Sequence, residues 1–116
     1  MRNIHFSLLT FQFSLLNSII TMVVGLGIIT FRIHECHSLK EKRSIVKSVI
    51  RHIRNNFNAS VAEVGANDIH QRAEIGIALA GNDRTEVNSK MDKIFNFADG
   101  LGIAQVIDTE MEILSY

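Results

Sequence analysis

Apolar residues along the chain alternate between the short period of strands and the 3.6-residue period of helices, and they predict six elements. The first is a strand at residues 23–33, which has few polar residues on either face and therefore suits the middle of a sheet. Gly25 and Gly27 fall on one face of this strand, which indicates that another element approaches it closely. Three more strands are predicted, at residues 58–64, 72–80 and 104–114.

Two amphipathic helices are predicted between these strands. In the first, at residues 38–57, Ser38 and Glu41 have the spacing of a capping box, so Ser38 caps the helix and Glu41 reaches back toward its start. Its apolar stripe consists of Leu39, Val46, Val49, Ile50, Ile53 and Phe57. The second helix follows a turn at residues 81–83, and Gly100 suits the position just past its end. Its stripe consists of Val87, Met91, Ile94, Phe95 and Ala98.

The element order β-α-β-β-α-β predicts one α+β domain with a ferredoxin-like fold at residues 22–116. In this fold, two helices pack on one face of a four-stranded antiparallel sheet. Right-handed crossovers place the first and third strands in the middle of that sheet. The other face, which includes Gly76, Ala78 and the acidic residues of the last strand, has no helix to cover it, so a dimer partner or the N-terminal segment can lie there. On the last strand Asp108, Glu110 and Glu112 are expected on one side, with Ile107, Thr109, Met111 and Ile113 on the other.

Residues 1–21 differ from the rest, because no Lys, Arg, Asp or Glu follows Arg2 until Arg32. Three interpretations remain open: translation that starts at Met22, an additional helix or strand, and a membrane or export segment. Scattered polar residues make this stretch a poor transmembrane helix, and no A-x-A-like cleavage site follows it. We therefore favour an N-terminal extension that comes from a wrongly assigned start.

The overall composition is that of a globular protein, with 47% hydrophobic and 21% charged residues. Twelve basic and twelve acidic residues cancel, so any attraction to nucleic acid must be local. The single cysteine, Cys36, excludes an internal disulfide and leaves the cytoplasm as the default location.

Six of the twelve basic residues lie in the first predicted helix, where the only acid is Glu41. Five of them recur at helical spacing: Lys40, Arg43, Lys47, Arg51 and Arg54. These five share an arc of roughly 80° around the helix and extend about 21 Å along its axis. Cations in the first turn oppose the helix macrodipole, and like charges four residues apart repel one another. These residues are therefore predicted to bind a polyanion: Lys40, Lys42, Arg43, Lys47, Arg51 and Arg54.

Two other interpretations of these cations remain open. They can form a solvated face whose aliphatic stems cover the edge of the core, or they can pair with acids of a partner subunit, such as Asp108, Glu110 and Glu112. Among polyanions RNA is slightly favoured over DNA. The predicted uncovered face lacks the aromatic residues that stack on RNA bases, so binding through the phosphate backbone is expected.

A short loop contains His34, Cys36 and His37, and Cys and His are the ligands that zinc prefers. The spacing fits no standard finger and no second cluster exists, so an ordinary polar loop is the preferred interpretation. We predict no metal site, no cofactor and no catalytic residue. Gly25 and Gly27 do not form a dinucleotide-binding loop, because they lie inside a strand. Arg72 begins a strand and either lines the basic surface or fixes the preceding turn.

Four segments resemble the YlxP-like family of small bacterial proteins, domain-of-unknown-function family 503: MVVGL at 22–26, HSLKEKRSIVKS at 37–48, NFNASVAEV at 56–64 and QRA at 71–73. HSLKEKR, which begins with His37 and Ser38, is the most specific motif. The resemblance implies a ferredoxin-like fold and supports a start at Met22. Members are often encoded beside genes for translation initiation and ribosome maturation factors, which implies a role near RNA or the ribosome. No catalytic residues are implied. Residues 1–21 and the HEC sequence at 34–36 depart from the family pattern.

The leading hypothesis is therefore a non-catalytic cytoplasmic module that binds RNA or a ribosomal particle through the first helix. The alternative is a homodimeric protein–protein adaptor that buries the uncovered face of the sheet. An enzyme or metal protein that uses the 34–37 loop is the weakest hypothesis.

Overall fold

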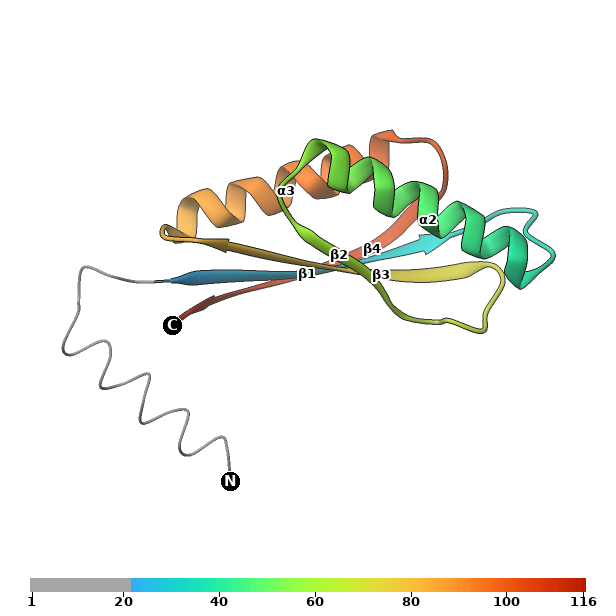
Figure 1. Ribbon diagram of the computed structural model, residues 1–116, viewed down its shortest axis with the longest axis horizontal. Helices are drawn as coiled ribbons and strands as arrows, with labels where there is room; N and C mark the ends of the chain where they lie inside the picture. Colours follow the sequence, from blue (N-terminus) through green and yellow to red (C-terminus); the bar gives the residue numbers. More distant parts are fainter. Residues whose placement is uncertain (1–21) are drawn as a thin grey trace, which may run out of the picture.

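The computed structural model describes residues 22–116, and it has the predicted βαββαβ order (Figure 1). The elements are β1 (Val23–Arg32), α2 (Leu39–Asn56), β2 (Ser60–Gly65), β3 (Arg72–Gly81), α3 (Arg84–Gly100) and β4 (Gln105–Ser115). The strands form one antiparallel sheet in the order β2-β3-β1-β4, and both helices lie on the same side of it. The α+β ferredoxin-like fold is thus confirmed, with the first and third strands in the middle as predicted.

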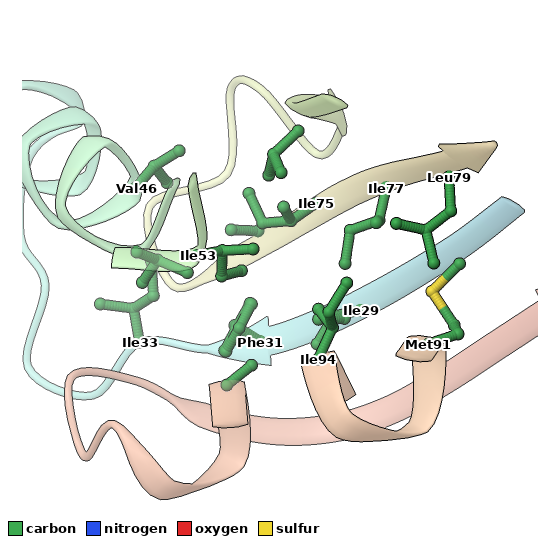
Figure 2. Packing of buried hydrophobic residues seen from close by; sticks show 14 of the residues in the cluster. Ile29, Phe31, Ile33, Val46, Ile53, Ile75, Ile77, Leu79, Met91 and Ile94 are labelled. Atoms are coloured by element: carbon green, nitrogen blue, oxygen red, sulfur yellow. The ribbon is translucent and has the colours of Figure 1, made fainter. Parts of the chain in front are cut away.

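The hydrophobic core lies between the sheet and the two helices. Figure 2 shows Ile29 and Phe31 of β1 near Ile75 and Ile77 of β3, with helix side chains such as Ile53 and Ile94 packed against them. The helices contribute the apolar stripes predicted from the sequence, and their fully covered members are Val46, Val49, Ile53, Val87, Met91, Ile94 and Ala98. At the C-terminal ends of the helices, the rings of Phe57 and Phe97 meet edge to face at a centroid distance of 5.3 Å.

The sequence predicted a close approach at Gly25 and Gly27, and the structure shows that α3 is the element that approaches β1 there. A methyl group at Gly25 would lie 2.7 Å from a Val87 side-chain carbon, and one at Gly27 would lie 2.7 Å from the Met91 sulfur. Any side chain here would push the helix away from the sheet. The two glycines therefore set how closely α3 packs.

Two local predictions were wrong. Gly100 is the last residue of α3 and does not lie past its end; the positive φ of 73° occurs at Gly102 instead. The register between β1 and β4 shifts between Thr30 and Phe31, so one extra residue of β4 enters the ladder there. Ile107 therefore lines the same cavity as Arg32 and Arg72 and does not share the helix-facing side of Met111.

The face of the sheet opposite the helices, which we call the open face, is not covered by any described element. Its centre is apolar, with Leu26, Ile28 and Val64 exposed by 41%, 38% and 55%. They line a shallow groove of about 360 Å³ together with Ala62, Gly76 and Ala78. The predictions for residues 1–21 lie outside the described residues. From residue 22 onward, neither helix has the length and apolar character that a bilayer span requires.

Candidate polyanion-binding surface on helix α2

The start of α2 is fixed by the side chains of the HSLKEKR motif. The Ser38 hydroxyl accepts the backbone N–H of Glu41 at 3.1 Å, so Ser38 is the N-cap as predicted. The Glu41 carboxylate in turn accepts the backbone N–H of His37 at 2.9 Å, one residue before the cap. The first bond satisfies an amide group that the first turn would otherwise leave free, and the second ties the preceding loop to the helix. Glu41 also supplies the negative charge that the helix N-terminus favours.

Five cations project from the exposed side of α2, and we call them the basic stripe: Lys40, Arg43, Lys47, Arg51 and Arg54. The structure places all five at the surface, on one helix, with the spacing that the sequence predicts. Within residues 22–116 the ion pairs are Lys42–Glu63 and Arg72–Glu74, so no stripe residue pairs with a carboxylate there. The positive charge of the stripe is therefore not neutralised by the described part of the chain.

Lys42 does not belong to this surface, contrary to the sequence prediction. Its side chain is 1% exposed, and its ammonium lies 3.1 Å from the Glu63 carboxylate and donates to the backbone carbonyl of Ala66. The physical reason is its position on the helix: the residue lies four before Val46, on the side that faces β2. Its charge is used inside the protein to hold the end of β2.

The C-terminal half of the stripe borders a groove between α2 and the edge strand β2. Lys47, Arg51 and Arg54 lie on the helix side of this groove, and Val61 and Ala62 lie on the strand side. The groove has a volume of about 420 Å³. Arg54 spans it by donating from Nη2 to the carbonyl of Val61 at 2.9 Å. This arrangement presents Lys47 and Arg51 to an anion beside the helix, and Glu63, which pairs with Lys42, is the one carboxylate among the groove residues.

The sequence alone did not indicate that β2 forms one wall of the surface. Asn55 and the Val61 carbonyl are polar groups of the groove that sequence reasoning missed. The bond from Arg54 to Val61 depends on the lateral distance between helix and strand. That distance is set by tertiary packing, for which the sequence pattern carried no signal.

The side chains of the 34–37 loop contact different partners and do not converge on one point. His34 Nε2 bonds Gln105 Oε1 of β4 at 2.7 Å, whereas the Cys36 thiol is buried and contacts the Ser38 carbonyl at 3.5 Å. Among the described residues, no three His, Cys, Asp or Glu side chains come together as metal ligands. His37 contributes its backbone N–H to the capping of α2.

Comparison with known proteins relates the chain to a protein family and to a bacterial protein. The family model described as "Protein of unknown function (DUF503)" matches residues 24–111. The "Uncharacterized protein YlxP" of Bacillus subtilis (strain 168) is 34% identical over 67 residues, which is 58% of this chain and 73% of that protein.

Solved structures give more distant similarities. The de novo designed protein Foldit4 aligns with a TM-score of 0.44 and 14% identity, over 84% of this chain and 97% of that one. LarC2, the C-terminal domain of a cyclometallase involved in the synthesis of the NPN cofactor of lactate racemase, aligns with a TM-score of 0.44 and 7% identity, over 84% of this chain and 58% of that one.

Proposed function

The chain belongs to the DUF503 family, and we propose that this member is a non-catalytic cytoplasmic module that binds RNA or a ribosomal particle through the basic stripe. The observation that carries the proposal is a row of five exposed cations on one helix, with no carboxylate partner among residues 22–116. Such a row repels itself and weakens the helix, and a bound polyanion removes that cost.

The chemistry of the stripe favours the phosphate backbone as the bound group. Arginine and lysine neutralise phosphates and release condensed counterions, whatever the base sequence. The open face offers no stacking platform, because the one aromatic residue in the described strands, Phe31, is buried in the core. The predicted ligand is therefore a structured RNA that presents phosphates along the helix, recognised by shape and charge.

A filter-binding comparison between two double variants tests this proposal. Lys47→Gln with Arg51→Gln removes two charges from the stripe, and Lys90→Gln with Lys93→Gln removes two exposed charges from α3. We expect the first pair to weaken binding of a hairpin RNA by about 100-fold at low salt, and the second pair to change it less than about threefold. Equal effects of the two pairs would mean that the stripe is not the binding surface.

A second candidate function is a homodimeric adaptor that buries the open face. The observation that favours it is the cluster of exposed apolar side chains there, Leu26, Ile28 and Val64, around an apolar groove. Sedimentation of the wild type should then report a dimer, and Ala78→Asp should give monomers. Gly76 is a poorer test position, because a Cβ there would lie 2.6 Å from a Val64 methyl and disturb the sheet itself. A dimer that survives Ala78→Asp rules out this face.

A further inference from the structure

Two arginines lie opposite each other on the central strands, on the open face. Arg32 of β1 is the direct register partner of Arg72 of β3, and both residues are exposed. Side chains in such a pair have Cβ atoms about 5 Å apart, and like charges there destabilise a sheet. An anion held between the two guanidinium groups would turn this repulsion into attraction.

Most of the donors of this arginine pair are free within the described chain. Arg72 Nη2 lies 3.4 Å from Glu74 Oε2, but the two side chains are 51% and 32% exposed, so solvent weakens this pair. The Arg32 guanidinium has no ion-pair or hydrogen-bond partner between residues 22 and 116. Since each guanidinium carries five N–H donors, the pair can surround a group that has several acceptor oxygens.

The arginine pair forms part of the wall of an open cavity of about 480 Å³, a size typical of small-molecule sites. Its other polar walls include His34 and Gln71. The His34 ring is held in place by its 2.7 Å hydrogen bond to Gln105. Glu35 is the one carboxylate among the lining residues, and Glu74, which pairs with Arg72, is a second carboxylate nearby.

Two exposed isoleucines also line this cavity. Ile69 belongs to the connection between β2 and β3, and Ile107 belongs to β4, on the far side of β1. Their exposed fractions are 51% and 43%. Ile107 is on the strand next to β1, and Ile69 lies three residues before Arg72, so both offer apolar surface to a ligand whose charged group is held between the arginines.

We infer that this cavity binds a nucleoside monophosphate group. A terminal phosphate has three free oxygens for the two guanidinium forks, whereas a carboxylate has two, and arginine recognises phosphate by paired hydrogen bonds. The nucleoside supplies the planar, partly apolar body that the isoleucines can contact. Its source is either a free nucleotide or the 5′-phosphorylated end of an RNA. The cavity lies on the open face, away from the basic stripe, so it does not depend on the function proposed for that stripe.

Calorimetric titration of the full chain with AMP, and separately with adenosine, tests the inference. We expect AMP to bind and adenosine to bind at least about tenfold more weakly, because adenosine lacks the phosphate. Arg32→Gln should weaken AMP binding by a similar factor. The matched control, Lys93→Gln on α3, and the stripe variant Lys47→Gln with Arg51→Gln should leave AMP binding unchanged. Both arginine positions are exposed, so a thermal melt should show that Arg32→Gln folds normally.

A second titration compares RNA oligonucleotides that carry a 5′-phosphate or a 5′-hydroxyl. A preference for the 5′-phosphate that Arg32→Gln abolishes assigns the site to RNA ends; binding of AMP without that preference assigns it to free nucleotides. The inference is wrong if AMP and adenosine bind alike, if neither AMP nor the 5′-phosphate is recognised, or if Arg32→Gln behaves like Lys93→Gln.

Discussion

The ammonium of Lys42 lies 3.1 Å from the Glu63 carboxylate, and this contact joins helix α2 to strand β2 inside the protein. The same ammonium donates to the carbonyl of Ala66, a residue held at a positive φ of 59° in the turn after β2. The Glu63 Oε2 atom is buried and has no hydrogen-bond donor in the described chain, so the charge of Lys42 is what compensates it. One cation of the HSLKEKR motif is therefore structural, while its neighbours Lys40 and Arg43 face solvent.

Replacement of Lys42 by methionine should lower the free energy of unfolding by about 3 kcal/mol, because it leaves the Glu63 carboxylate buried without its partner. Urea denaturation followed by circular dichroism measures this change. Lys40→Met is the control, since Lys40 is exposed, and it should change stability by less than about 0.5 kcal/mol. Adding Glu63→Leu to Lys42→Met should recover part of the loss. Equal stabilities of the two single variants would show that the pair does not hold β2.

Gly27→Ala should destabilise the fold by about 1–3 kcal/mol, because the new methyl group would lie 2.7 Å from the Met91 sulfur and 3.1 Å from the Phe95 ring. Gly100→Ala is the matched control: it lies at the end of α3 with nothing within 4 Å, and alanine favours a helix over glycine by roughly 0.5–1 kcal/mol. Thermal melts should therefore move in opposite directions for the two variants. A neutral Gly27→Ala would contradict the close packing of α3 on β1.

Ser38→Ala should remove the N-cap of α2 and lower stability by about 1 kcal/mol. Ser44→Ala changes the same atoms in the exposed middle of the helix, where alanine is the better helix former, so it should be neutral or slightly stabilising. Chemical denaturation of both variants provides the comparison. If they lose stability equally, the Ser38 hydroxyl does not cap the helix.

The sequence predicted the six elements, the strand order and most of the core, because these follow from local periodicity and from the handedness of crossovers. It also predicted the cap at Ser38 and the close approach at Gly25. Serine is strongly preferred at helix N-caps, and glycine inside a strand often marks the close approach of another element. The register shift that moves Ile107 was missed. The pattern of apolar residues in one strand does not show where an extra residue enters when that strand pairs with its neighbour.

The candidate site was less predictable than the fold. Helical spacing correctly separated the five residues of the basic stripe from the apolar face. It did not predict that Lys42 turns inward, because that depends on an acceptor carbonyl and a carboxylate more than twenty positions away in the chain. The pairing of Arg32 with Arg72 likewise follows only from the register of β1 and β3.

The most direct test of the central proposal is the salt dependence of RNA binding by the full chain. A plot of log affinity against log salt concentration should fall steeply for the wild type. The slope of Lys47→Gln with Arg51→Gln should be shallower by about two, one for each phosphate contact removed, while Lys90→Gln with Lys93→Gln keeps the wild-type slope. A wild-type affinity that does not change with salt, or the same slope in all three proteins, would contradict the proposal that helix α2 binds the phosphate backbone.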